Sequence, residues 1–243
     1  MVSQDRVATY IPGLDDLIEG GFPKSSLILI SGTPGTGKSN FCSHVLYNNA
    51  VKGKKCLYLN LEQGEGRLEM QMKQFGWDAS KAQNLKIVTI DSSNPQIVEN
   101  VLREIEKGPY DIVALDSLDS ISTNPASVEE IQQQLRDRIP TITLPALFDQ
   151  ATLSRLKIKK IFSAITKSKA TAIVTSERVE GAQGISRDTV SEFLCDGTLL
   201  LSSAAIGKKR VRTLEISKMR YTDTPGGRYD LEITKKGLIV SGL

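Results

Sequence analysis

The sequence contains few of the residues that form disulfides, transition-metal sites and hydrolytic triads. Its 243 residues include one histidine, one tryptophan and three cysteines. Cys42, Cys56 and Cys195 form no C-x-x-C pair, so we expect reduced core residues. No His/Cys metal-binding spacing and no Ser-His-Asp arrangement is visible, which leaves Mg²⁺ as the only metal expected. His44 is expected to face solvent or to pack, and Trp77 to anchor packing.

Long apolar stretches are also missing. No run approaches the roughly eighteen apolar residues of a membrane span, and residues 1–10 have no apolar core of signal-peptide length. The apolar fraction of 40% and charged fraction of 24% are ordinary for a globular protein. We expect one cytoplasmic domain over residues 1–243, with no membrane association. A net charge of +3 does not by itself indicate nucleic acid, although basic clusters at 157–160 and 208–210 keep that class open.

Residues 32–39, Gly-Thr-Pro-Gly-Thr-Gly-Lys-Ser, match the pattern G-x-x-x-x-G-K-[ST] in full. The apolar run 26–30 precedes them and a helical pattern over 38–51 follows, which is the order that a phosphate-binding loop requires. Glycines let consecutive N–H groups surround an anion, and the helix adds the positive end of its dipole. We expect Lys38 to reach the β- and γ-phosphates of ATP and Ser39 to hold Mg²⁺. The residues predicted to bind the nucleotide are Thr33, Pro34, Gly35, Thr36, Gly37, Lys38, Ser39 and Asn40.

Hydrophobic runs alternate with helical patterns, which indicates an α/β fold with a mostly parallel sheet and helices on both faces. Strands are expected over 55–61, 85–90, 112–115 and 172–175, and helices around 68–75 and 97–105. Short β-type runs at 198–201 and 211–216 and a hairpin over 228–240 indicate antiparallel strands added to one sheet edge. The interval from about 123 to 168 exceeds one crossover helix, so we expect a helical insertion, with helices over 128–138 and 153–168.

Two carboxylates are expected beside the nucleotide. Asp116 closes the apolar run 112–115, where a carboxylate faces the Mg²⁺ shell at the carboxyl edge of a parallel sheet. Glu62 ends the strand after the phosphate-binding helix, so it projects into the same crevice and is the best general-base candidate. From the pattern alone, Asp116 as a helix cap and Glu62 as a solvated strand end remain open.

Further motifs extend along the chain: YIPGLDDLIEGGFP at 10–23, LNLEQ at 59–63, FGW at 75–77, LDSL at 115–118, SER at 176–178, GISR at 184–187, EF at 192–193, DG at 196–197 and KMR at 218–220. Together with the phosphate-binding loop they resemble the RecA-superfamily ATPases of the KaiC and RadA type, including single-domain KaiC proteins of archaeal type. The resemblance covers nearly the whole chain outside the insertion. It implies a RecA-like P-loop fold that binds and hydrolyses ATP with Mg²⁺.

The resemblance also implies a homo-oligomeric ring or filament, commonly a hexamer, with ATP between subunits. Lys218 and Arg220 would then reach the γ-phosphate of the neighbour's ATP, and such a trans arginine accelerates hydrolysis by roughly 10³ to 10⁵. From the residues alone, a Lys-x-Arg after a strand is typical of a solvated edge. Gln63 stands where KaiC-type sites carry a second glutamate beside Glu62, so slow or regulated turnover is expected. The Glu-Phe pair at 192–193 is that of the KaiC ATPase half, which disfavours autophosphorylation.

Three functions remain open on the sequence. The first is an oligomeric ATPase that switches a regulatory or signalling protein partner. The second is a recombinase paralogue that binds single-stranded DNA in DNA repair through residues 180–190 and the insertion, although that loop has few basic residues and no aromatic platform. The third is a non-catalytic regulator that holds ATP as a structural ligand, which Gln63 suggests.

Overall fold

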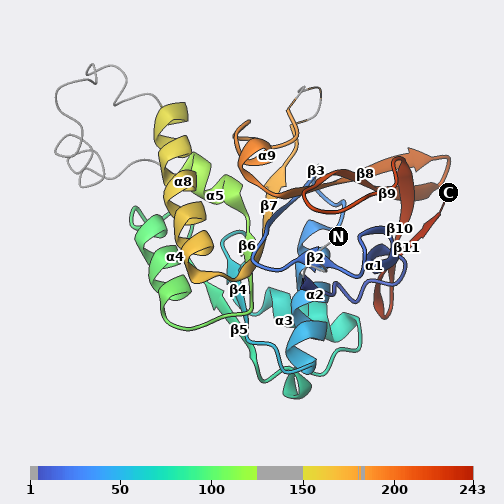
Figure 1. The fold of residues 1–243 in the computed structure, drawn as a ribbon, viewed down its shortest axis with the longest axis horizontal. Helices are drawn as coiled ribbons and strands as arrows, with labels where there is room; N and C mark the ends of the chain where they lie inside the picture. Colours follow the sequence, from blue (N-terminus) through green and yellow to red (C-terminus); the bar gives the residue numbers. More distant parts are fainter. Residues whose placement is uncertain (1–4, 125–149, 180, 182–183, 243) are drawn as a thin grey trace.

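The computed structural model describes residues 5–124, 150–179, 181 and 184–242. Strands of the main sheet are ordered β11-β10-β9-β8-β3-β7-β6-β4-β5 (Figure 1). Outside it, β1 pairs antiparallel with β2. The strands are β1 (Arg6–Val7), β2 (Phe22–Pro23), β3 (Leu27–Gly32), β4 (Cys56–Asn60), β5 (Leu85–Thr89), β6 (Ile112–Asp116), β7 (Thr171–Glu177), β8 (Gly197–Ile206), β9 (Lys209–Met219), β10 (Arg228–Thr234) and β11 (Gly237–Gly242). The helices are α1 (Leu14–Leu17), α2 (Lys38–Val51), α3 (Arg67–Gln74), the 3-10 turn η1 (Ala79–Lys81), α4 (Ile97–Glu106), α5 (Leu118–Thr123), α8 (Gln150–Ser168) and α9 (Ser191–Leu194).

The expected mostly parallel sheet is confirmed. Strands β5, β4, β6, β7, β3 and β8 are parallel to their neighbours in that series, and β9, β10 and β11 continue the sheet in antiparallel pairs. The expectation for 198–201 was wrong in one respect. This run belongs to β8, which is antiparallel only to β9, because its other edge pairs in parallel with β3 from Ile28 to Gly32.

Helices cover both faces of the sheet, as expected. Successive residues of β3 alternate between two cores, because side chains in a strand point to opposite faces. Ile28 and Ile30 pack with residues of α2, whereas Leu27 and Leu29 pack with residues of α4, α5 and α8. Figure 1 shows α4 and α8 side by side, away from α2 and the C-terminal strands. The phosphate-binding loop therefore emerges between two buried layers.

The insertion is described only in part. Helix α8 confirms the helix predicted over 153–168, and its apolar residues Ile158, Ile161 and Ile165 lie in the core shared with α4 and α5. The helix predicted over 128–138 lies outside the described residues. Within the part of the chain that the structure describes, no helix combines the length and apolar character needed to cross a bilayer.

The rare residues pack as predicted. Cys42, Cys56 and Cys195 are buried and free. Trp77 stacks on Tyr47 with ring centroids 4.9 Å apart. The ring of buried His44 meets Trp77 edge-on at 5.4 Å. These aromatic rings tie α2 to the segment that follows α3.

Candidate nucleotide-binding site

The phosphate-binding loop lies between β3 and α2, and its backbone depends on glycine. Gly35 and Gly37 adopt φ angles of 78° and 108°, in the left-handed region that favours glycine. A Cβ on Gly32 would lie 2.4 Å from the Leu201 carbonyl oxygen, so no side chain fits there. Gly37 immediately precedes the first residue of α2, so the loop presents amide groups at the positive end of a helix.

Lys38 is buried at the start of α2 and points back across the loop. Its Nζ donates to the carbonyl oxygens of Gly32 at 2.8 Å and Thr33 at 3.3 Å. Thr36 Oγ1 donates to the same Thr33 oxygen at 2.8 Å. The ammonium group thus lies on the concave side of the loop, where it would meet the terminal phosphates of a nucleotide.

Asp116 ends β6 and is fully buried beside α2. Its Oδ2 accepts a hydrogen bond from the Tyr58 hydroxyl at 2.7 Å, and its Oδ1 accepts one from Thr175 Oγ1 at 2.5 Å. Burial, followed by the charge of Asp116, raises the pKa of the Tyr58 hydroxyl and of the Cys42 thiol. The carboxylate is therefore held in place by hydroxyl groups from β4 and β7.

Glu62 follows β4 and brings a second carboxylate toward the same point. Burial, and then the charge of Asp116, raises its pKa, whereas the charge of Lys38 acts in the opposite direction. Lys38 and Asp116, which come from two other segments, are thus both within electrostatic reach of Glu62.

Gln63 has a different environment from Glu62. Its N–H donates to Asn60 Oδ1 at 3.0 Å, and its carbonyl oxygen accepts from Asn60 Nδ2 at 2.8 Å. These bonds close the turn after β4. Glu62 is the residue of this pair that supplies a carboxylate to the site.

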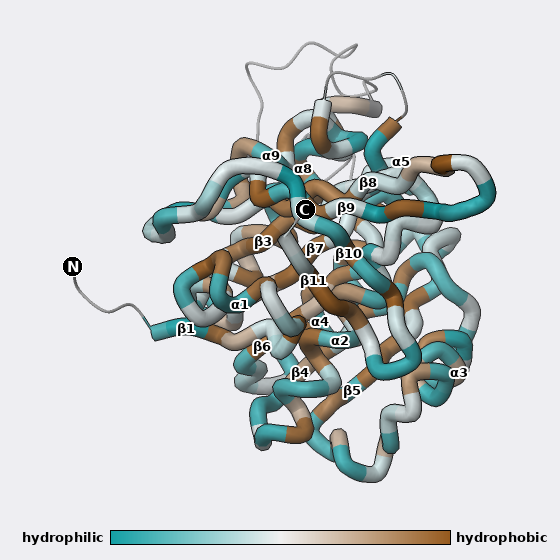
Figure 2. Tube along the Cα trace, turned by 90° about the vertical axis from the view of Figure 1, so that its right-hand side faces the viewer, coloured by the Kyte–Doolittle hydropathy of each residue, from teal (hydrophilic) through white to brown (hydrophobic). Residues whose placement is uncertain are grey.

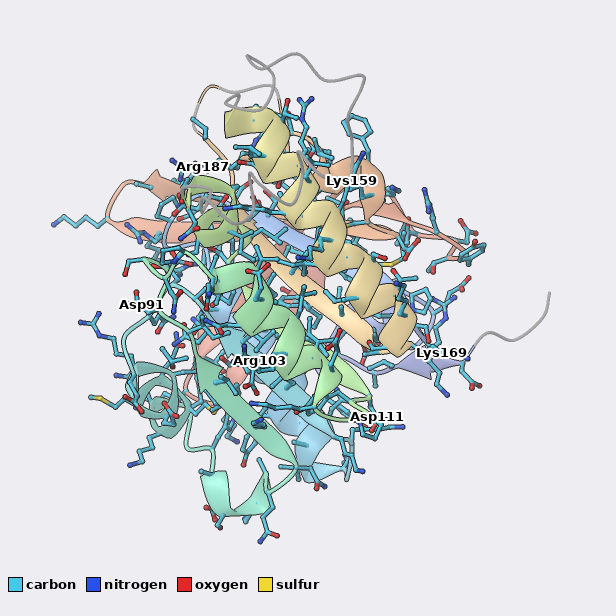
Figure 3. The ribbon with its side chains drawn as sticks, turned by 90° about the vertical axis from the view of Figure 1, so that its left-hand side faces the viewer. Asp91, Arg103, Asp111, Lys159, Lys169 and Arg187 are labelled. Carbon is cyan, nitrogen blue, oxygen red and sulfur yellow. The ribbon has the colours of Figure 1, made fainter. Side chains whose placement is uncertain are left out.

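A pocket of about 290 Å³ adjoins Glu62 and contains residues that the sequence analysis did not single out for the site. Buried Asp119, in the first turn of α5, accepts hydrogen bonds from the Glu177 N–H at 2.6 Å and from Ser176 Oγ at 3.2 Å. Burial raises the pKa of Asp119 to about 6. Arg187 forms an ion pair with Glu177 at 3.2 Å and also lines the pocket, beside α5 (Figure 3). The one feature of the sequence that could have pointed to Asp119 is its position three residues after Asp116.

Lys218 and Arg220 lie near the amino-terminal end of β3, whereas the phosphate-binding loop follows its carboxyl-terminal end. The Arg220 N–H donates to the Asp196 carbonyl oxygen, and the Asp196 N–H donates to that of Leu27, at the start of β3. The loop follows Gly32, at the other end of that strand. The structure therefore does not bring Lys218 and Arg220 to the site of their own chain.

Both side chains have partners in their own chain. Lys218 Nζ donates to the carbonyl oxygens of Cys195 at 2.6 Å and Glu192 at 3.3 Å, at the end of α9. Arg220 pairs with Asp196 at 3.1 Å and keeps half of its side-chain surface exposed.

The two basic clusters differ in exposure. Lys157 is buried and donates to the Asn124 carbonyl oxygen at 3.1 Å, and Lys160 pairs with Glu99 at 3.1 Å. Lys159 is exposed on α8 (Figure 3). The run 157–160 is therefore not a continuous basic surface, whereas residues 208–210 are all exposed at the turn between β8 and β9.

The residues present fit ATP with Mg²⁺. Amide groups of the loop and the Lys38 ammonium suit phosphate oxygens, while the Ser39 hydroxyl and the Asp116 carboxylate are the hard oxygen donors that Mg²⁺ prefers. Both Asp116 oxygens already accept hydrogen bonds, which suits a carboxylate that holds the ion through bound water.

Comparison with known proteins agrees with this geometry. The family model described as "ATPase: KaiC" matches residues 7–242. The circadian clock protein KaiC3 of Synechocystis sp. is 34% identical over 242 residues, which cover 97% of this chain and 45% of that protein. A UPF0273 protein of Saccharolobus solfataricus is 31% identical over 241 residues, which cover 97% of this chain and 82% of that protein. The chain thus spans less than half the length of KaiC3 and most of the length of the archaeal relative.

A solved structure supports the same relationship. The KaiC-like protein from the hyperthermophilic archaeon Pyrococcus horikoshii OT3 superposes with a TM-score of 0.78 at 26% identity, covering 98% of this chain and 99% of that one. The sheet described above therefore has the RecA-like arrangement of KaiC-like proteins.

Proposed function

The chain belongs to the KaiC family of ATPases, and on that premise we propose that it is an oligomeric ATP hydrolase whose nucleotide state switches a regulatory protein partner. The observation that carries the proposal is the convergence of Lys38, Glu62 and Asp116 beside the phosphate-binding loop. These residues come from α2, the segment after β4 and the end of β6, which are far apart in the sequence, so it is the fold that brings them together.

The loop residues Thr33 to Asn40 would bind the triphosphate of ATP, with Lys38 on the β- and γ-phosphates. Ser39 would hold Mg²⁺ directly, and Asp116 would orient its water ligands. Mg²⁺ supplies charge neutralisation for phosphoryl transfer. Lys38 adds a positive charge from the protein at the same phosphates.

Glu62 would act as the general base on the attacking water. Its raised pKa makes it a better proton acceptor than an ordinary glutamate. The neutral amide of Gln63 cannot replace it, because an amide accepts no proton at neutral pH. We therefore expect hydrolysis to depend on a single carboxylate and to be slow.

A neighbouring subunit would supply Lys218 and Arg220 to the γ-phosphate. Their position near the amino-terminal end of β3 supports this arrangement, because it is too far from the loop of their own chain, which follows the other end of that strand. Arg220 has an exposed guanidinium held by one ion pair, which a stronger charge-assisted contact to phosphate could replace. Lys218 would need to leave the end of α9 or to act while bound to it.

The direct test measures phosphate release and mass in solution together, with and without ATP. Steady phosphate release that Glu62→Gln abolishes is the expected result, and it would reject a regulator that only holds ATP. Lys38→Ala should remove nucleotide binding in calorimetry. A Glu62→Gln protein that still releases phosphate at the wild-type rate would refute the assigned base.

Single-stranded DNA binding stays a second candidate because residues 208–210 form an exposed basic turn. Addition of excess oligonucleotide separates the two functions. Stimulated hydrolysis with salt-dependent binding would support the recombinase alternative, and an unchanged rate without binding would discard it.

A further inference from the structure

The hairpin formed by β8 and β9 extends beyond the rest of the sheet. Pairing of β8 with β3 ends at Leu201, opposite Gly32, and pairing of β9 with β10 reaches only to Thr213. Among the strands that the structure describes, residues 203–206 and 209–212 pair only with each other, and Ser202 pairs only with Thr213. Figure 2 shows this hairpin at the right-hand edge of the molecule, where a brown stretch of β8 leads into a teal turn. The outer edge of each strand therefore carries backbone groups without a sheet partner.

The two faces of the hairpin differ. Leu201 and Leu214 are directly opposite each other and are buried in the core of α2, which identifies the face toward that helix. Side chains alternate along a strand and directly paired residues share a face. The α2 face of the hairpin thus carries Ser203, Ala205, Arg210 and Arg212, and the other face carries Ser202, Ala204, Ile206, Lys209, Val211 and Thr213.

Contacts with the phosphate-binding loop agree with this assignment. Arg212 Nε donates to the Gly35 carbonyl oxygen at 3.3 Å, and a Cβ on Gly35 would lie 3.5 Å from Arg210 Nη1. On the other face, Ile206 has 65% of its surface exposed. One face of the hairpin is therefore basic with small neighbours, and the other carries an apolar strip of Ala204, Ile206 and Val211 beside Lys209.

The hairpin is strongly positive. Residues 202–213 contain four cations and no acidic residue: Lys208, Lys209, Arg210 and Arg212. Among the ion pairs of the described residues, none involves these four side chains. Their charge is available to an acidic partner.

We propose that the hairpin binds an acidic segment of a partner protein, which adds as an extended strand to the edge of β8 at residues 202–206. Five residues offer an edge of about 17 Å. The β8 edge is favoured over that of β9, because residues 204–206 of β8 are exposed whereas residues 211–213 of β9 are half-buried. A strand with alternating acidic and apolar residues matches both faces, with acidic side chains toward Arg210 and Arg212.

The apolar face favours protein over nucleic acid. Exposed Ile206 and neighbouring Val211 are apolar and make no favourable contact with phosphates. Residues 202–213 also include no aromatic side chain on which a base could stack. A free strand edge pairs with the N–H and C=O groups of a peptide backbone, which a nucleic acid lacks. The chemistry of the hairpin thus combines charge, an apolar strip and main-chain hydrogen bonding.

The bond from Arg212 to Gly35 also links the hairpin to the phosphate-binding loop. A change in nucleotide would therefore alter affinity for the partner. This coupling rests on the proposed function, whereas binding of the acidic strand does not. Lys38→Ala separates them, since this variant should lose nucleotide binding and keep peptide binding.

The test uses fluorescence anisotropy with a labelled peptide of about ten alternating Glu and Val residues. An isomer with all Glu residues before all Val residues has the same charge and cannot place them on opposite faces. We expect the alternating peptide to bind at least about tenfold more tightly than the isomer. The double variant K208E/K209E should lose about tenfold or more of this affinity. The matched variant K54E/K55E makes the same change in net charge at two exposed lysines preceding β4, and it should bind like wild type.

A second variant, Ile206→Asp, places a negative charge at the apolar tip and should weaken binding in the same way, with its fold checked by circular dichroism. Equal binding of the two peptide isomers would overturn strand addition, and absence of binding would overturn the site. Displacement of the alternating peptide by oligo-dT of about 20 nucleotides would assign the hairpin to nucleic acid instead. Self-association that K208E/K209E abolishes, without peptide binding, would assign it to a second copy of the chain.

Discussion

Mixing two inactive variants tests whether neighbouring chains share one catalytic site. Arg220 is level with Leu27, and the phosphate-binding loop follows Gly32, five residues further along β3. At about 3.3 Å per residue these levels are about 16 Å apart, which is too far for Arg220 to serve its own loop. Arg220→Ala should therefore leave ATP affinity nearly intact and slow turnover, by roughly 10³ or more if the arginine acts in trans.

The recovery expected on mixing follows from the composition of the sites. A shared site takes Glu62 from one subunit and Arg220 from its neighbour. In an equimolar, randomly assembled mixture of Glu62→Gln and Arg220→Ala, about one quarter of the sites combine both wild-type residues. The mixture should regain about one quarter of the wild-type rate per subunit, although each variant alone is nearly inactive.

Phosphate release after subunit exchange measures this recovery, with mass in solution confirming mixed oligomers. A matched control mixes Glu62→Gln with Lys38→Ala, because these residues serve the same site from one chain and should not complement. If Arg220 acted on its own chain, every site in the first mixture would lack one residue. No recovery in confirmed mixed oligomers would therefore refute the shared site.

The remaining predictions concern protonation. Because the pKa of Glu62 is raised, ATP hydrolysis should fall on acidification with an apparent pKa above the ordinary 4.5, and a rate unchanged down to that pH would contradict its role as base. Burial lowers the pKa of His44, so the unfolded chain binds the proton first, and the free energy of unfolding should decrease as pH falls below about 6.5. Urea unfolding of His44→Asn should lack this dependence, and an unchanged pH profile would refute the assignment. Folding raises the pKa of Asp119 from 3.8 to about 6, so its carboxylate costs stability above pH 6 and this cost is relieved in acid. In urea unfolding, Asp119→Asn should have a higher free energy of unfolding than wild type at about pH 7. This difference should shrink by up to about 3 kcal/mol at about pH 4, and a difference that does not change with pH would contradict the raised pKa.

Local sequence patterns predicted the parts of the fold that depend on neighbouring residues. The strand, loop and helix over 26–51 were correct because glycine spacing, apolar runs and helical periodicity each act within a few residues. The pairing of β8 was not predictable in this way. Its β-type residues are compatible with either direction, and only its position beside β3 selects a parallel pair on that edge.

The candidate site shows the same limit. Glu62 and Asp116 could be proposed because each ends a recognisable strand, and the carboxyl ends of parallel strands meet at one edge. Asp119 was missed, because an aspartate in the first turn of a helix ordinarily serves the helix terminus. Its bond to the Glu177 N–H crosses from α5 to β7, and no local pattern encodes that contact. Lys157 was assigned to a basic cluster because a charged residue gives no sign in sequence that it is buried.

Asp119, which lines the same pocket as Glu62, also begins a series of hydrogen bonds that leads toward α9. Ser176, which donates to Asp119, accepts from the Arg187 N–H at 3.1 Å. The adjacent Ser186 hydroxyl donates to Glu192, whose carbonyl oxygen accepts from Lys218. The pocket beside one nucleotide is thus connected by hydrogen bonds and short stretches of backbone to the lysine proposed to act on the next. Under the proposed function, this series would offer a path of contacts from the pocket of one site to the lysine that serves its neighbour.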